Sequence, residues 1–186
     1  MSIAERLPAS KSGPAPMTLR RVALECLRTA CLTLVVCLVI VTFIGRSYQV
    51  FGSCMDPNLV TGERLLGSKL AYVLHAPARG DIIVFTYPQD KTKTYVKRVI
   101  ALPGEKVEIT NGVVLIDGHA LKEPYLRHAP HGDFPVCVVK PGCLFVMGDY
   151  RDCSNDSRYW GQLPISDIQA KAWLRYWPIP RAQLLH

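Results

Sequence analysis

An uncharged apolar run near the amino end limits what this chain can fold into more than any other feature. It reads TACLTLVVCLVIVTFIG from Thr29 to Gly45, seventeen residues without Asp, Glu, Lys or Arg. A helix on the surface of a globular protein needs a polar face, and this run has none. Because about twenty apolar residues span a bilayer, we expect a somewhat short transmembrane helix over residues 21–45.

A cleaved signal peptide is the alternative explanation of the run. The apolar core of such a peptide has about 7–15 residues, and a small-x-small cleavage site follows it. Here seventeen uncharged residues are followed by RSYQVFG, which has no such site. The sequence therefore favours a retained anchor.

The charges that flank the run predict its orientation. Five basic residues precede it and Arg46 alone lies close after it; the five are Arg6, Lys11, Arg20, Arg21 and Arg28. Under the positive-inside rule the amino terminus stays in the cytoplasm. We therefore predict a disordered cytoplasmic tail over residues 1–20, a single pass through the cell membrane over 21–45, and an extracytoplasmic domain over 46–186.

The net charge of +7 and the pI of about 9.1 raise the question of nucleic acid. Residues 1–46 hold six Lys/Arg against two Asp/Glu, whereas residues 47–186 hold sixteen against thirteen. The basic excess is densest beside the apolar run, where it suits membrane topology. Because no basic stretch is interleaved with aromatic residues, we predict no nucleic-acid partner.

Seven cysteines are spread over the whole chain. Cys26, Cys31 and Cys37 fall in or near the apolar run, where they behave as small apolar residues. The other four belong to the exported part, where disulfides are possible; they are Cys54, Cys137, Cys143 and Cys153. No CxxC pair and no zinc-like Cys/His spacing occurs, so we predict neither a metal nor another cofactor.

Five short segments after residue 80 predict β-strands, because they are rich in β-branched and aromatic residues and end at Gly or Pro. They are 81–87, 93–102, 106–110, 113–118 and 143–149. Asn111-Gly112 predicts a type I′ hairpin, and Asp117-Gly118 and Pro141-Gly142 are further turn candidates. With one helical turn expected near Ile165–Lys171, we predict a mainly β fold: an antiparallel sheet in a partly open, barrel-like domain after one amino-terminal transmembrane helix.

Three segments of this domain carry a family resemblance. GSCMDPNLVTGERLL (52–66) resembles the type I signal peptidase box written Ser-Met-x-Pro-Thr-Leu, in which that Ser is the nucleophile. KRVIALPGEKVEI (97–109) is similar to the box with the catalytic Lys, and GDYRDCSNDSRYWGQLP (148–164) resembles the third box. The resemblance implies a catalytic domain that removes N-terminal signal peptides from exported preproteins after small residues.

The resemblance also assigns the catalytic pair. Met55 and Pro57 align with the Met and Pro of the first box, so Cys54 stands where the family has its serine, and Ser53 is out of register by one residue. A thiol ionises more readily than a hydroxyl, so a dyad of Cys54 and Lys97 is chemically sensible. Two outcomes stay open: an active peptidase, or a catalytically inactive relative that binds exported peptides or an active partner.

The base and its supports follow from the same boxes. An exposed lysine holds its proton at neutral pH, and only burial or a nearby positive charge favours the neutral amine that a base requires. The resemblance implies that Ser154 hydrogen-bonds Lys97 and orients it. Gly52 stands where some members carry a hydroxyl of the oxyanion hole, so the Cys54 amide and the Ser53 hydroxyl remain as candidate donors.

A buried ion network is expected between the third box and the lysine strand. Asp156 is expected to pair with Arg158, and Arg98 with Asp149 or Asp152. A Cys54–Cys153 disulfide and a Cys137–Cys143 disulfide across a hairpin both stay open, because the sequence does not give the separation that a disulfide needs.

The substrate is expected to bind as an added strand, with alternate side chains in shallow pockets. The candidate binding residues lie before Cys54 and Lys97 or directly after Cys54; they are Tyr48, Val50, Phe51, Met55, Tyr95 and Val96. Apolar side chains are also expected to touch the lipid bilayer; these are Tyr48, Val50, Phe51, Leu59 and Trp160. The sequence predicts no oligomeric state.

A self-cleaving regulator of the LexA type would share a Ser/Lys pair. Such regulators carry a DNA-binding helix-turn-helix at their amino end, where this chain has its apolar run. The sequence therefore favours the signal peptidase interpretation.

Overall fold

The computed structural model describes residues 19–43 and 45–185, without the side chains of residues 38–43 and 74. The chain divides into two compact units, Met1–Val39 and Ile40–His186, which we treat separately. Most of the tail predicted over residues 1–20 lies outside the described residues.

Helix α1 (Leu19–Phe43) covers most of the segment for which a transmembrane helix is predicted. Its first ten residues include Arg20, Arg21, Glu25 and Arg28. Within the described part of the chain, no helix meets the length and hydropathy that a membrane span requires. The helix is therefore confirmed, and its passage through a membrane is not.

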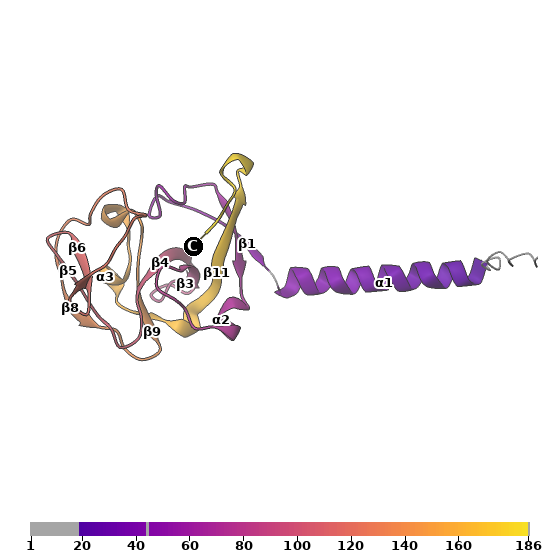
Figure 1. Ribbon diagram of the computed structural model, residues 1–186, viewed down its shortest axis with the longest axis horizontal. Helices are drawn as coiled ribbons and strands as arrows, with labels where there is room; N and C mark the ends of the chain where they lie inside the picture. Colours follow the sequence, from indigo (N-terminus) through magenta and orange to yellow (C-terminus); the bar gives the residue numbers. More distant parts are fainter. Residues whose placement is uncertain (1–18, 44, 186) are drawn as a thin grey trace, which may run out of the picture. The chain divides into compact units, whose positions relative to one another are not determined.

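The larger of two antiparallel sheets builds most of the second unit (Figure 1). Its strands follow the order β1 (Arg46–Gln49), β2 (Arg64–Ser68), β11 (Ile168–Trp177), β3 (Ile82–Thr86), β4 (Thr94–Ala101), β9 (Cys143–Met147) and β10 (Leu163–Pro164), and β12 (Gln183–Leu184) pairs with β11. Because the described strands leave β1 and β10 as edges, hydrogen bonds do not close this sheet into a barrel.

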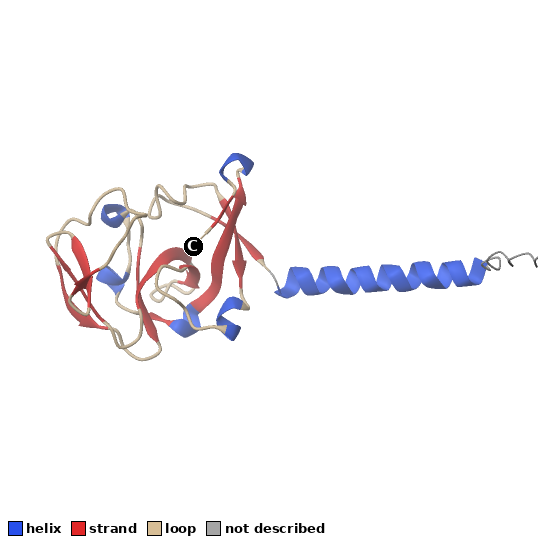
Figure 2. Cartoon of the chain, in the orientation of Figure 1, coloured by secondary structure: helices blue, strands red, loops and turns tan. Residues whose placement is uncertain are grey.

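The smaller sheet has the order β7 (His119–Ala120), β6 (Val113–Ile116), β5 (Lys106–Thr110) and β8 (Phe134–Val138). Strands dominate the unit and helical turns are short (Figure 2). The turns are α2 (Ala71–Leu74), η1 (Arg151–Cys153), α3 (Ser157–Trp160), η2 (Ile165–Asp167) and η3 (Ile179–Arg181). The predicted mainly β, antiparallel fold is confirmed.

All five predicted strand segments contain a strand, namely β3, β4, β5, β6 and β9. The helical turn predicted near Ile165–Lys171 is wrong after residue 167, because η2 ends there and β11 begins at Ile168. The pairing of β11 with β2 and β3 shifts register at three places. These shifts break the alternation of apolar and polar residues by which a strand is recognised in a sequence.

The two predicted hairpin turns have the backbone that such turns require. Asn111 and Gly112 have φ of 50° and 74°, and Asp117 and Gly118 have φ of 50° and 79°. Both pairs therefore adopt the left-handed conformation that Asn, Asp and Gly tolerate best. Pro141-Gly142 also forms a turn, closed by the Cys143 amide donating to the Lys140 carbonyl at 3.1 Å, but it joins β8 and β9, which belong to different sheets.

Buried apolar residues form three clusters, of which one lies under the first box. It contains Val50, Met55, Leu59 and Leu65, with Ile82, Val84 and Ala172 from strands β3 and β11. Burial of these side chains fixes the segment after β1 against the larger sheet.

We predict that Gly67→Ala destabilises the fold. A Cβ on Gly67 would lie 2.8 Å from the Ala170 Cβ and 2.8 Å from Tyr48 Cε2, so strands must shift to admit it. We expect the free energy of unfolding to fall by about 1–3 kcal/mol, measured by urea denaturation of the full chain in detergent. Gly45→Ala is the control, since its Cβ would meet nothing closer than 3.7 Å. Equal losses in the two variants would contradict the packing argument.

Candidate active site

A groove of about 680 Å³ runs between two strand edges of the larger sheet. Residues 48–54 line one side, and Thr94–Lys97 of β4 line the other. Strand β4 pairs with β3 along Thr94–Arg98 but with β9 only from Arg98 onward. Thr94–Lys97 therefore presents an edge that is unpaired among the described strands, as an added peptide strand requires.

Cys54 opens an irregular turn that follows the wall of the groove. Its Sγ is half-buried and lies 3.9 Å from the carbonyl oxygen of Val96, the residue before Lys97. The amide of Tyr150 donates to the Cys54 carbonyl at 3.0 Å. The third box therefore holds the backbone of residue 54, and the thiol contacts the lysine strand.

Lys97 is buried although its side chain is basic. It is 2% exposed, lines the same groove as Cys54, and pairs with Ile83 across β3 and β4. Its Nζ lies 5.6 Å from the centre of the Tyr95 ring. Among the described residues, no carboxylate pairs with this amine and no hydrogen bond to it is formed. Lys97 is therefore a buried amine that shares a groove with a thiol and lacks a counter-ion among the described residues.

Ser154 is buried beside the carbonyl of Cys54. Its Oγ donates to Asp156 Oδ2 at 2.7 Å and accepts from the Gly148 amide at 3.1 Å. A Cβ on Gly148 would overlap both Ser154 and the Cys54 carbonyl, so glycine permits their close approach. The hydrogen bond expected between Ser154 and Lys97 is not among those that the described structure forms.

The ion network expected from the sequence is present. Arg98 binds Asp149 with both ends of its guanidinium, Nε to Oδ1 at 2.8 Å and Nη2 to Oδ2 at 2.7 Å. Arg158 binds Asp156 at 2.8 Å. Burial opposes the charge of Arg158, but its hydrogen bond to Asp156 and the charge of Asp156 outweigh this effect and raise the pKa of Arg158.

Asp152, the alternative partner of Arg98, pairs with His131 instead. His131 contacts it through the backbone amide at 3.0 Å and through Nδ1 at 2.6 Å. These hydrogen bonds hold the pKa of Asp152 below its ordinary value, and the bond from the His131 backbone amide has the largest effect.

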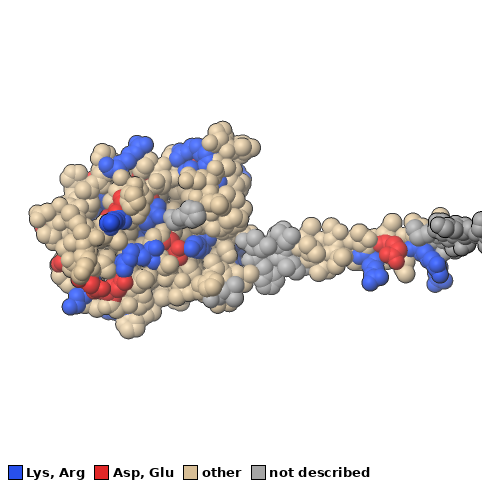
Figure 3. Space-filling model, in the orientation of Figure 1, with Lys and Arg blue, Asp and Glu red and all other residues tan. Residues whose placement is uncertain are grey.

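Charged side chains of both signs lie side by side on the face of this unit shown in Figure 3.

The cysteines of the described structure are all free. Cys153 lines the groove beside Cys54, and its Sγ lies 3.4 Å from the Ser53 hydroxyl. Cys137 accepts from Gln162 Nε2 at 3.2 Å. Of the two disulfides that the sequence left open, neither is formed, and Cys137 and Cys143 lie on strands of different sheets.

The predicted binding residues divide into two groups. Five of them line the groove, as do Gly52 and Ser53; the five are Tyr48, Val50, Phe51, Tyr95 and Val96. Met55 does not, because it is 0% exposed in the core under the first box. One position after Cys54 in a tight turn, its side chain points into the protein.

Most residues expected to touch the bilayer are not exposed. Val50 and Leu59 are buried, and Trp160 packs with its ring 5.9 Å from those of Phe85 and Tyr87. Only Phe51, at 74%, is largely exposed. The buried and half-buried members of this set pack in the apolar clusters under the first and third boxes. An apolar residue near the site is therefore not by itself evidence of a membrane-facing surface.

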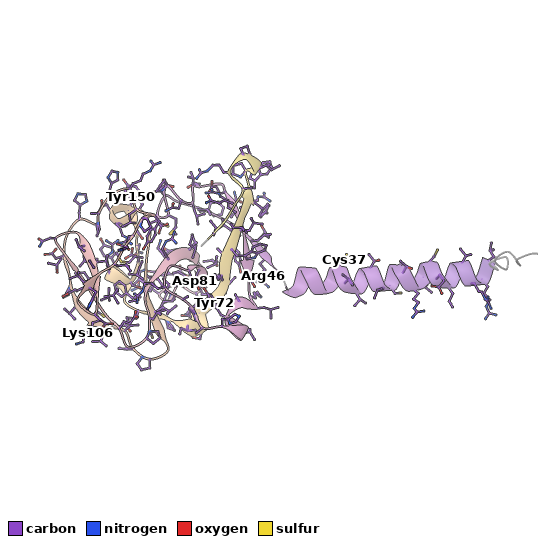
Figure 4. The ribbon with its side chains drawn as sticks, in the orientation of Figure 1. Cys37, Arg46, Tyr72, Asp81, Lys106 and Tyr150 are labelled. Atoms are coloured by element: carbon purple, nitrogen blue, oxygen red, sulfur yellow. The ribbon has the colours of Figure 1, made fainter. Side chains whose placement is uncertain are left out.

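Several residues of the site were not predicted. Gln49, Leu65, Val84, Thr92, Thr94 and Asn155 also line the groove. Tyr72 and Asp81, which form a hydrogen bond of 2.9 Å at α2 (Figure 4), are not among the residues that line it. The polar residues carry no sequence signal by themselves, and Val84 stands in the continuous apolar run 82–85, which does not show which side chain faces the groove.

The geometry supports nucleophilic chemistry on a carbonyl compound. A thiol and a buried amine share one groove, and backbone edges beside them can hold an extended peptide. Among the described residues, no cluster of His, Cys, Asp and Glu is arranged to hold a metal ion.

Comparison with known proteins gives consistent similarities. A family model described as signal peptidase, peptidase S26, matches residues 23–177. The chain is 41% identical over 155 residues to a probable signal peptidase I-1 of Synechocystis, covering 80% of this chain and 79% of that protein. It is 37% identical over 166 residues to the signal peptidase I of Leptolyngbya laminosa, covering 85% and 81%. A solved signal peptidase I from Enterococcus faecalis is 32% identical with a TM-score of 0.48, covering 52% and 97%.

We predict that Asp149→Ala strongly destabilises the fold, because it leaves the Arg98 guanidinium buried without its carboxylate. Breaking such a buried pair costs about 3–5 kcal/mol, measured by chemical denaturation of the full chain followed by tryptophan fluorescence. Asp167→Ala breaks the pair with Lys91, whose side chain is 59% exposed, and should cost less than about 1 kcal/mol. A similar loss in both variants would rule out a special role for the buried pair.

Proposed function

Because the chain belongs to the signal peptidase family, peptidase S26, we propose that Cys54 and Lys97 are the catalytic pair with which it removes signal peptides from exported preproteins. Membership makes the chain a signal-peptidase hydrolase. The observation that supports the pair is the shared groove, in which Lys97 is 2% exposed and forms no ion pair with the described carboxylates.

The reaction begins with proton transfer from the Cys54 thiol to the neutral Lys97 amine. The thiolate attacks the scissile carbonyl carbon, and the resulting oxyanion needs hydrogen-bond donors. The Cys54 amide and the Ser53 hydroxyl are the candidates, since Gly52 supplies no side chain. When the C–N bond breaks, the lysine proton passes to the leaving amine and a thioester remains.

Water completes the cycle. Lys97, neutral again, takes a proton from a water molecule whose oxygen attacks the thioester carbonyl. The C–S bond breaks, the Lys97 proton returns to the Cys54 sulfur, and the signal peptide leaves as a carboxylic acid that loses its proton to solvent. Each step uses the same base, so one buried amine is sufficient.

The substrate binds in this proposal as a strand between the two edges of the groove. The backbone of Thr94–Lys97 offers hydrogen bonds on one side, and residues 48–53 cover the other. Tyr48, Val84 and Val96 line the same groove as Cys54, and we propose that they form the shallow pocket for small substrate side chains. Burial raises the pKa of the Tyr48 hydroxyl, which Arg46 partly opposes, so this wall of the groove stays uncharged.

We also propose that residues 21–45 anchor the domain 46–186 in the cell membrane, with the amino terminus in the cytoplasm. The uncharged run from Thr29 to Gly45 and the excess of basic residues before it support this topology. The full chain should remain in the membrane fraction after alkaline carbonate extraction. Its release by carbonate would contradict the anchor.

A second function rests on one observation, the cysteine at the position of the family serine. A sulfur atom is larger than oxygen, and a displacement of the reacting carbonyl lowers the rate steeply. An inactive chain would still bind exported peptides in the same groove, or bind an active partner.

We predict that Lys97→Ala abolishes the cleavage of a preprotein by the full chain in detergent. General base catalysis contributes about 10²–10⁴-fold, so the rate should fall by at least about 100-fold, measured from the shortened product on a gel. The control is Lys93→Ala, which changes an exposed lysine of the same hairpin. Full activity of the Lys97→Ala variant would contradict the proposal that Lys97 is the general base.

Substitutions of Cys54 separate the two functions in the same assay. If the unaltered chain cleaves and Cys54→Ala does not, the thiol is the nucleophile. If only Cys54→Ser cleaves, the natural chain is the inactive relative.

A further inference from the structure

The nucleophile turn, which we define as residues 53–60, belongs to no helix or strand. Its carbonyl groups therefore have no sheet partners and depend on other donors. The carbonyls of Pro57 and Asn58 accept hydrogen bonds from two arginines near the carboxyl end of the chain, Arg175 and Arg181. Neither arginine belongs to the three boxes that resemble the family.

Arg175 is a buried residue of strand β11, with 5% exposure. Its Nη1 donates to the carbonyl of Asn58 and lies 3.3 Å from Glu63 Oε2. Its Nε and Nη2 donate to the Arg181 carbonyl at 2.6 Å and to Gln183 at 3.1 Å. The guanidinium thus joins the nucleophile turn to the segment that follows β11.

Arg181 holds the same turn from the end of η3. Its Nη2 donates to the carbonyl of Pro57 at 3.1 Å, and its Nη1 lies 3.1 Å from Glu63 Oε1. That carboxylate oxygen accepts no hydrogen bond from the described residues, so the attraction is mainly between charges. Arg181 is partly exposed, with 41% of its side chain accessible.

Glu63 gives both arginines their position. It is 3% exposed, and its Oε2 also accepts from the Val60 amide at 3.0 Å, at the end of the turn. A buried carboxylate requires opposite charge nearby, and here two guanidinium groups supply it. Glu63, Arg175 and Arg181 form what we call the carboxyl-terminal clamp.

We propose that Arg175 and Arg181 are positioning residues for the reaction, and that the clamp sets the place of the Cys54 sulfur opposite Lys97. Pro57 follows Cys54 by three residues, and the Leu59 amide donates to the Met55 carbonyl at 2.8 Å, so movement at Pro57 is transmitted to Cys54. The inference rests on the proposed function. A displacement near 1 Å costs about 100-fold in rate, so a small relaxation of the turn has a measurable effect.

Arg181→Gln tests the clamp, because a partly exposed residue is replaced and the fold should persist. We expect kcat for preprotein cleavage to fall by at least about 10-fold with KM within about twofold, as loss of alignment requires. The kcat of Arg181→Lys should lie between those of the natural chain and Arg181→Gln. An ammonium group keeps the charge, but it does not match both Glu63 and the Pro57 carbonyl.

The thiol itself provides a readout that does not depend on cleavage. Alkylation of Cys54 by iodoacetamide, followed peptide by peptide with mass spectrometry, should slow in Arg181→Gln, because the thiol loses its place beside the base. Cys137 of the same chain is the internal reference. If Cys54 alkylation is unchanged and kcat stays within twofold of the natural chain, the positioning role of the clamp is contradicted. The proposal that Cys54 and Lys97 are the catalytic pair is not affected by that result.

Arg79→Gln is the matched control. Arg79 also bridges a carboxylate and a backbone carbonyl, those of Glu105 and Ile100, but it makes no contact with the nucleophile turn. Its kcat and Cys54 alkylation rate should stay within twofold. An equal loss in this variant, or a raised KM with unchanged kcat in Arg181→Gln, counts against positioning. If the natural chain does not cleave, the catalytic pair fails and the alkylation rates still test the clamp.

Discussion

The carboxylate of Asp149 joins the three segments that form the site. It binds Arg98, the neighbour of Lys97, with both oxygens, and it accepts from Asn58 of the nucleophile turn at 2.8 Å. The adjacent Tyr150 amide donates to the Cys54 carbonyl. A buried carboxylate without partners is costly, and so is a buried guanidinium. The positions of the nucleophile turn, strand β4 and the third box therefore depend on one another.

The domain pairs its buried charges with one exception. Arg98 has Asp149, Arg151 has Glu123, Arg158 has Asp156 and Arg175 has Glu63. Among the described buried residues, Lys97 alone carries a basic side chain with no opposite charge beside it. A buried amine without a partner costs stability. Its place in the groove that Cys54 also lines is the observation on which the proposed role of Lys97 rests.

How much the sequence predicts depends on whether the signal is local. β-Branched and aromatic content between turn residues predicts β3 to β6, and the β3–β4 and β5–β6 pairs have a regular register. They do not predict β11, whose bulges bring Arg175 to a buried position that no fixed period of two would indicate. The boxes predict that Cys54 and Lys97 share a groove. They do not predict that Met55 points into the core or that Ser154 binds Asp156, because those outcomes depend on packing between distant segments.

The cysteine at position 54 changes what the surrounding structure must supply. The scaffold contacts residue 54 through its backbone, and the only side-chain contact of Cys54 among the described hydrogen bonds is with the Val96 carbonyl. An exchange of serine for cysteine is therefore compatible with the framework. A thiol needs a weaker base than a hydroxyl does, whereas its longer bonds to carbon make the reaction more sensitive to where the sulfur lies. If Cys54 is the nucleophile, the groups that fix the nucleophile turn become more important than the basicity of Lys97; in this chain they are Asp149, the Tyr150 amide and the two arginines of the proposed clamp.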